Sequence, residues 1–308
     1  MEMALIAARA VQFASAMIVL GTPLLRLGLG LGFEHAATAC GEFDRWLRRL
    51  MLIAAALALA SALAWLDLEA AIMGDGWGEA IDSETIEAVL LQTTFGHAWI
   101  WHLAFGATLL ATLLFTRVWA AARGWAILGL AAGLVASLAW AGHAVMQPGS
   151  AHVMVQVIHL LAAAVWLGSL PALYYLLERS RRAEGSAWHT ALIQLLPRYS
   201  RAGYCAVAAV VLTGCLNSWF LVGSLPALVA TDFGRVLLAK VGLVLVMVAV
   251  AAINRVHLAP RIRLQRVSQD QARALVALWR NVATEQLLGA LVIVAVSVLG
   301  TLPPAIAH

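Results

Sequence analysis

The feature that most restricts the fold of this chain is a series of eight long apolar segments. They lie near residues 4–25, 50–70, 95–117, 124–143, 153–177, 202–222, 234–254 and 283–302. An α-helix rises about 1.5 Å per residue, so roughly 20 apolar residues cross the hydrocarbon core of a membrane. The segments are continuous and lack the ten-residue alternation of a membrane β-barrel. The sequence therefore predicts an all-α, polytopic membrane helical bundle with about eight transmembrane helices.

The composition supports a membrane protein with little soluble structure. Hydrophobic residues make up 63% of the 308 residues and charged residues only 12%, whereas soluble domains carry about 25% charged residues. We expect a single membrane domain over residues 1–308, placed in the lipid bilayer of a bacterial-type inner membrane. The first apolar segment follows Met1, Glu2 and Met3 without a basic region, and it is interpreted as a retained helix.

The basic residues predict the orientation of the bundle. Of the 20 basic residues, 17 fall in alternate connections, between the first and second, third and fourth, fifth and sixth, and seventh and eighth segments. Only Arg9, Arg235 and Lys240 fall near the other side. The positive-inside rule places the 17 in the cytoplasm and both termini in the periplasm. Because the arginines follow the membrane topology, no nucleic-acid partner is expected.

The longest connection on the predicted outer side is acidic. It carries seven acids and no Lys or Arg: Asp67, Glu69, Asp75, Glu79, Asp82, Glu84 and Glu87. One interpretation is a solvated loop with a short surface helix, and the other is a vestibule that attracts cations. On the fourth segment, Gly129 and Gly133 form a GxxxG pattern, which predicts a close helix crossing.

Histidines near the outer side are the main candidates for chemistry. The uncharged stretch between residues 142 and 159 contains His143, His152 and His159 together with Met146 and Met154. His152, Gln156 and His159 are spaced to share one helical face. His97 and His102 lie on the third segment. Imidazole within a bilayer is costly unless it meets a partner or a cavity, so these residues are functional candidates.

The type of ligand favours copper, zinc or iron over calcium or magnesium. Imidazole suits the first three metals, and thioether sulfur shifts the choice towards Cu(I). No carboxylate lies in the segments that carry the cluster, which disfavours calcium and magnesium. The alternative is that each histidine only forms hydrogen bonds between helices.

Two further polar positions lie within the apolar segments. Lys240 is expected either to extend towards the outer surface or to meet Asn217 at a similar depth. Glu285 lies level with Asn254 and Arg255, and a structural ion pair is the favoured interpretation. A proton or ion relay at Glu285 is the alternative.

Several stretches resemble the copper resistance protein D family of inner-membrane proteins. They are GHA (142–144), HLLAAAVWLGSL (159–170), RYSRAG (198–203), TGCLNSW (213–219), TDFGRVLLAKVGL (231–243), NRVHLAPRI (254–262) and EQLLGALVIVAVSVLGTLPPA (285–305). Together they define a core that resembles the family over residues 142–305. Residues 1–141 match less clearly, through the span count and FGHAW at 95–99.

The resemblance implies movement of copper ions, Cu(I) or Cu(II), from periplasm to cytoplasm, alongside a periplasmic copper-binding protein. The positions at which the resemblance implies a functional role are His143, His159, Trp166, Asn217, Lys240, Asn254 and Glu285. No nucleotide-binding motif occurs and the only lysine is Lys240, so ATP cannot power transport within this chain, and we expect no enzymatic activity.

Two other functions remain open from the residues alone. His102 and His159 lie on different segments at comparable depths, as the axial ligands of a haem b electron-transfer protein would. A structural or assembly subunit, whose histidines only form hydrogen bonds, is the third hypothesis.

Overall fold

The chain folds into an all-helical bundle in a computed structural model that describes residues 1–28, 30, 37–115, 121–142, 150–182, 186–264 and 269–305. The helices run in the order α1 (Glu2–Leu27), α2 (Ala37–Met73), η1 (Trp77–Ile81), α3 (Ser83–Gln92), α4 (Thr94–Phe115), α5 (Ala121–Ser137), η2 (Leu138–Ala141), α6 (Ser150–Leu167), α7 (Leu170–Arg182), α8 (Ala187–Val222), α9 (Ala227–Ala230), α10 (Asp232–Ile253), the π-helical turn η4 (Asn254–Leu258), α11 (Ala259–Leu264) and α12 (Gln269–Leu299). Within the described residues, eight helices are long and apolar enough to span a membrane. The predicted fold class is confirmed.

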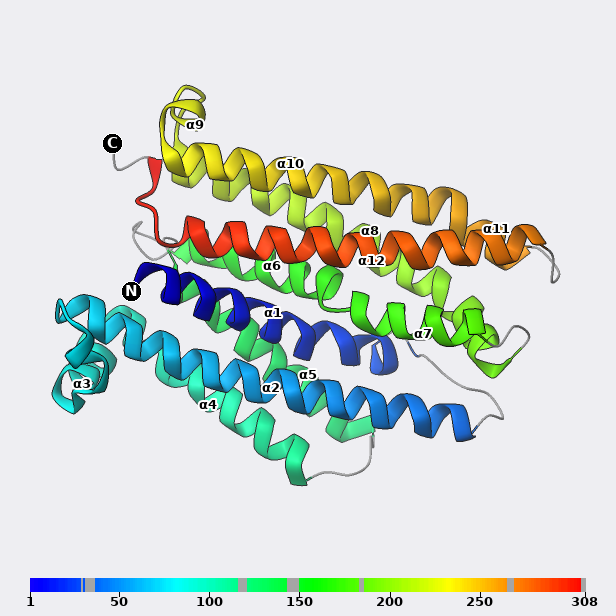
Figure 1. The fold of residues 1–308 in the computed structure, drawn as a ribbon, viewed down its shortest axis with the longest axis horizontal. Coiled ribbons are helices and arrows are strands. Elements are labelled where there is room, and N and C mark those ends of the chain that lie inside the picture. Colours follow the sequence, from blue (N-terminus) through cyan, green and yellow to red (C-terminus); the bar gives the residue numbers. More distant parts are fainter. Residues whose placement is uncertain are drawn as a thin grey trace.

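The helices lie roughly along one direction and alternate between two ends of the molecule (Figure 1). The start of α1 and the end of α12 lie at the same end, where the Thr301 hydroxyl donates to Glu2 at 3.4 Å. The short helices α3 and α9 lie at this end too, and α11 lies at the opposite end (Figure 1). The alternation agrees with the predicted connections, and the assignment of the α1 end to the periplasm stays a prediction.

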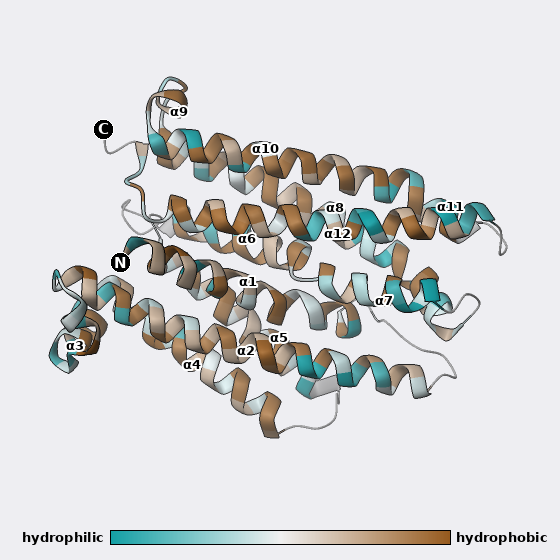
Figure 2. Ribbon diagram, viewed as in Figure 1, coloured by the Kyte–Doolittle hydropathy of each residue, from teal (hydrophilic) through white to brown (hydrophobic). Residues whose placement is uncertain are grey.

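Apolar residues predominate along the long helices (Figure 2), and many of them are exposed. Leu212, Leu245 and Leu287 are each more than 60% exposed, a pattern expected for surfaces that face lipid. In hydrocarbon, every backbone N–H and C=O group must be satisfied within the chain, which helices achieve by themselves. Several helices extend further towards the charged end than the apolar segments predicted, since α2, α8 and α12 begin at residues 37, 187 and 269.

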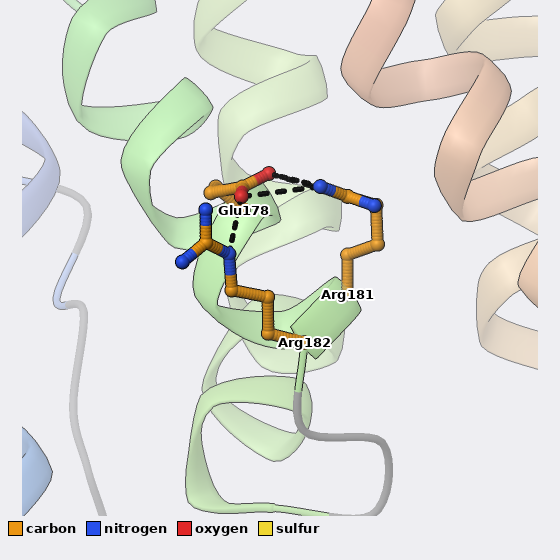
Figure 3. A network of polar contacts seen from close by, with 3 residues as sticks. All are labelled: Glu178, Arg181 and Arg182. Atoms are coloured by element: carbon orange, nitrogen blue, oxygen red, sulfur yellow. Dashed lines mark hydrogen bonds and ion pairs between the residues drawn. The ribbon is translucent and has the colours of Figure 1, made fainter.

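The charged end of the bundle holds most of the ion pairs. On α7, Glu178 accepts from Arg181 at 2.8 Å and from Arg182 at 2.5 Å (Figure 3). Between helices, Arg26 pairs with Asp44, and Arg179 pairs with Glu42. Exposed pairs of this kind add little stability each, so their main effect is to fix this end outside the hydrocarbon.

The acidic connection forms the short surface structure expected of a solvated loop. It contains η1 and α3, and Asp82 caps α3 by accepting the backbone N–H of Thr85 at 2.8 Å. The backbone N–H and the hydroxyl of Thr85 hold the pKa of the Asp82 carboxyl below its ordinary value. At least one of the seven acids therefore has a structural role.

The fifth membrane segment is broken in its middle, which the sequence did not predict. Helix α6 ends at Leu167 and α7 begins at Leu170, with Gly168 and Ser169 between them. Helix α1 crosses this break in backbone contact, because a Cβ on Gly168 would lie 1.8 Å from the Met17 carbonyl oxygen. The Thr22 hydroxyl donates to the carbonyl oxygen of Gly168 at 2.9 Å.

The GxxxG pattern on α5 does not make the close crossing predicted for it. A Cβ on Gly133 would meet the ring of Phe105 at 2.8 Å, whereas a Cβ on Gly129 would find no atom within 4 Å. Only one of the two glycines faces a neighbour, so the prediction is wrong for Gly129. The closest backbone approach is between α1 and α6, at Gly168 and Gly21. A Cβ on Gly21 would lie 2.3 Å from the Ala164 carbonyl oxygen.

Candidate functional site

A line of polar side chains runs along the contact between α6 and α8. On α6 it comprises His152, Gln156, His159 and Trp166, whose spacing places all four on one face of the helix. The amide nitrogen of Asn217 on α8 donates to Gln156 at 2.8 Å, and His159 contacts Thr213 of α8 at 2.9 Å. From His152 to Trp166 the helix rises about 21 Å, most of the roughly 30 Å hydrocarbon thickness. We call these residues the α6–α8 polar line.

The outer end of the polar line has two buried atoms without hydrogen bonds. The side chain of His152 is 4% exposed and that of Asn217 is 9% exposed. Among the described residues, neither the Nδ1 atom of His152 nor the Oδ1 atom of Asn217 has a hydrogen-bond partner, although the two side chains interact with each other. Buried polar atoms are normally satisfied, so such exceptions require an explanation. Imidazole nitrogen and amide oxygen are both metal-ligand types, so the pair fits a cation.

The hydrogen bonds of His159 determine which of its nitrogens is available. The Thr213 hydroxyl donates to the carbonyl oxygen of Ala209 at 2.5 Å, so it accepts from the Nδ1–H group of His159 at 2.9 Å. In a neutral imidazole, Nε2 then carries the lone pair. No described residue forms a hydrogen bond with Nε2 of His159. Nε2 is therefore the nitrogen of His159 that is available to a metal ion.

Lys240 on α10 lies beside this part of the polar line. Its ammonium group acts electrostatically on His159, and its side chain is partly buried. The Oδ1 atom of Asn217, which would accept from the Lys240 ammonium, has no hydrogen-bond partner among the described residues, so the suggested contact between Asn217 and Lys240 is not formed.

The inner end of the polar line leads to a buried carboxylate. Glu285 on α12 is 3% exposed. It accepts from the Asn254 amide at 2.6 Å and from the Trp166 indole at 3.3 Å. Asn281 donates to the Oδ1 atom of Asn254 at 2.7 Å. Residues that are far apart in the sequence therefore meet here: Trp166 on α6, Asn254 on η4 and Glu285 on α12.

The ion pair favoured for Glu285 is not formed. Within the described part of the chain, no ion pair joins Glu285 to a basic side chain within 4.0 Å. The guanidinium of Arg255 instead lies 5.2 Å from the ring centroid of Tyr204. Arg255 acts on Glu285 only electrostatically, and the direct partners of the carboxylate are two neutral donors.

His102 belongs to a separate, fully hydrogen-bonded cluster. The Ser137 hydroxyl donates to the carbonyl oxygen of Leu134 at 2.9 Å and accepts from Nδ1 of His102 at 2.8 Å. Nε2 then accepts from the amide of Gln12 at 2.8 Å, and the Oε1 atom of Gln12 accepts from Ser61 at 2.7 Å. Both ring nitrogens of His102 are used, which corresponds to the structural alternative weighed for every histidine.

Two of the remaining predicted ligands, His97 and Met154, are not brought to the polar line. His97 is exposed on α4, and its Nε2 contacts the carbonyl oxygen of Leu91 at 2.9 Å. Met154 is 58% exposed, away from the face that carries His152 and His159. His143 and Met146 lie outside the described residues. Within the described ranges, no three His, Cys, Asp or Glu side chains gather as a metal site.

The geometry gives no support to a haem site between His102 and His159. Helix α6, which carries His159, packs on α1, α5, α8 and α12. His102 lies on α4 and faces α1 and the end of α5. A haem ligand needs a free ring nitrogen, and His102 has none.

Comparisons with known proteins identify the family of this chain. Residues 1–153 match a family model described as copper resistance protein D-like, N-terminal domain, and residues 193–299 match one described as copper resistance protein D. Copper resistance protein D of Pseudomonas syringae pv. tomato is 30% identical over 97% of this chain and 96% of its own length. The chain belongs to the copper resistance protein D family.

Other relatives place this family member in the inner membrane. Inner membrane protein YebZ of Escherichia coli (strain K12) is 32% identical over 97% of this chain and 98% of its own length. Copper transport protein CutJ of Bacillus subtilis (strain 168) is 30% identical over 75% of this chain, which covers 44% of that protein. No solved structure matches. With its eight apolar helices, this copper-related protein is a multi-pass inner-membrane protein.

Sequence reasoning missed Thr213, Ser169 and Tyr199 as members of this region. Thr213 sets the tautomer of His159, and the hydroxyls of Ser169 and Tyr199 lie 3.3 Å apart at the helix break. The available signal was spacing, since Tyr199, Thr213 and Asn217 share one face of α8. Hydroxyl residues are common within membrane helices, so type alone did not single them out.

Proposed function

We propose that this chain carries copper ions across the inner membrane, from the periplasmic to the cytoplasmic side, along the α6–α8 polar line. The support is its membership of the copper resistance protein D family and the name of its relative, copper transport protein CutJ. The direction follows from the family resemblance together with the predicted placement of the arginine-rich end in the cytoplasm.

The observation that carries the proposal is the pair of unsatisfied buried atoms at the outer end, Nδ1 of His152 and Oδ1 of Asn217. A passing copper ion would satisfy both and could then reach the open Nε2 of His159, two helical turns further along α6. Imidazole suits copper in either oxidation state. The hydrogen bond to Thr213 fixes the tautomer of a neutral His159 and leaves Nε2 as the atom that can accept the ion.

A conducting site must bind the ion and also release it. Few ligands and the nearby positive charge of Lys240 both limit how tightly copper is held at His159. An entering cation gains about 2.3 kcal/mol per charge for each 100 mV of negative-inside potential, which supplies a driving force without ATP.

The acidic connection lies at the end where copper would enter. Its carboxylates at Glu84 and Glu87 provide negative charge for attracting a cation or a basic surface. A periplasmic copper-binding protein is the partner we propose for this end, as the family resemblance implies.

Copper uptake by cells that express the protein tests the proposal. In the His152→Ala, His159→Ala double variant, we expect the initial rate of copper accumulation, measured by metal analysis, to fall at least about tenfold. The matched control is His97→Ala, which removes an exposed histidine at the same end and should leave the rate unchanged. Equal rates in the double variant and the wild type, at equal amounts of protein in the membrane, would exclude the path.

A further inference from the structure

The buried carboxylate of Glu285 lies where the fold departs twice from regular helix. Helix α6 breaks off at Gly168 and Ser169. Helix α10 is followed by η4, a π-helical turn that begins at Asn254. Broken membrane helices and π turns are both associated with functional sites. Glu285 is bonded to one residue beside each of them, to Trp166 and to Asn254.

Among the described residues, no basic side chain forms an ion pair with this carboxylate. Its two hydrogen-bond donors are a neutral amide and a neutral indole. A carboxylate enclosed in the membrane without a cation in contact is costly, and such residues mark ion and proton pathways. The simplest way to remove the cost is to bind a proton.

The charged and titratable groups around Glu285 come from several helices, and none of them contacts it. Arg255 on η4 lies over Tyr204, and Tyr199 on α8 is bonded to Ser169. From α7, Arg181 lies 4.8 Å from the ring centroid of Trp279, nearly two turns away along α12. From α1, Arg9 approaches Gly300, about four turns away in the other direction.

A small cavity lies near the carboxylate. Its volume is about 10 Å³, and it lies at the helix break, lined by Trp166, Ser169, Tyr199 and Gly203 among others. That volume is close to the least that holds one water molecule. Trp166 lines the cavity and donates to Glu285, so one side chain connects the cavity with the carboxyl group.

We propose that Glu285 is a proton-binding site within the membrane, and that its proton is released when a copper ion enters the polar line. The second part rests on the proposed function. Protonated Glu285 is neutral, whereas its ionised carboxylate attracts a cation strongly in a low-dielectric region, so the entry of a copper ion favours release of the Glu285 proton. The carboxylate left behind attracts the copper ion inwards from His159, and the proton passes to water at the helix break.

Infrared difference spectroscopy of the purified protein in lipid nanodiscs tests the site without any copper. We expect the carbonyl band of a protonated carboxylic acid to appear and disappear as the pH is changed. It should be lost in Glu285→Gln and shifted in Glu285→Asp. The matched control is Glu69→Gln, because Glu69 also accepts from a tryptophan, Trp65 at 2.9 Å, but lies partly exposed. A band that survives in Glu285→Gln would overturn the proposal.

Proton release on adding Cu(I) alone, followed with a pH dye in weak buffer, tests the coupling. The wild type should release about one proton more per bound copper than Glu285→Gln. Equal release by both proteins would overturn the coupling. If no copper binds, the proposed function fails with the coupling, while the infrared result for Glu285 stands separately.

Discussion

The contact between α1 and the break in the fifth span is the tightest in the bundle and gives the sharpest stability prediction. In Gly168→Ala, the new Cβ would lie 1.8 Å from the Met17 carbonyl oxygen and 2.6 Å from the Ala164 carbonyl oxygen. Both obstacles are backbone atoms, so rotation of a side chain cannot relieve them. Helix α1 must move away by about 1.5 Å to restore an ordinary contact distance.

The expected loss follows from this displacement. Overpacking a well-packed site costs about 1–3 kcal/mol, and separating the helices also breaks the hydrogen bond from Thr22 to Gly168, worth about 1 kcal/mol. A total near 3 kcal/mol corresponds to a decrease in Tm of about 6 °C, at roughly 2 °C per kcal/mol for a chain of this size. Thermal unfolding of the detergent-solubilised protein measures it.

The control for this variant is Gly242→Ala on α10. A Cβ at Gly242 would find no atom within 4 Å, and alanine is favoured over glycine in a helix by up to about 1 kcal/mol. We expect an unchanged or slightly higher Tm. If Gly168→Ala melts at the same temperature as Gly242→Ala, the backbone contact between α1 and the break does not exist, and the reasoning is refuted.

Two further predictions concern the histidine cluster and the orientation. His102→Ala should lower the free energy of unfolding by about 2–5 kcal/mol, because it leaves Gln12 and Ser137 buried without their partner. Copper uptake per folded molecule should stay at the wild-type level. A normal Tm would contradict the hydrogen-bond network. In a background without native cysteines, Glu84→Cys should react with an impermeant thiol reagent in spheroplasts, and Thr190→Cys only after the membrane is breached. The reverse pattern would invert the predicted topology.

The eight spans and their alternation could be predicted because both depend on local sequence. Each apolar segment satisfies its own backbone as a helix in hydrocarbon, and the basic residues mark alternate connections whatever the helices pack against. Helix lengths were less accurate, since the amphipathic starts of α2, α8 and α12 leave the hydrocarbon and carry charge. The break at Gly168 was missed because Gly168, Ser169 and Pro171 are compatible with a continuous membrane helix.

The candidate site could be predicted only in part. The spacing of His152, Gln156 and His159 correctly placed them on one face, because helical periodicity is a property of one segment. The same reasoning overvalued Met154, which lies on the exposed side of the same helix. It also predicted an ion pair for Glu285, because level positions along two helices say nothing about which way a side chain such as Arg255 turns.

The sequence by itself determined that this chain is a membrane bundle of eight helices with polar groups in its spans. Only the tertiary structure decided which of those groups are free to act. His102 and His159 are alike in sequence, as histidines within apolar segments. His102 meets Ser137 and Gln12, which occupy both of its nitrogens, while His159 meets Thr213, which occupies one. The difference arises because the partners come from helices remote in the sequence, and helix packing alone brings them into contact.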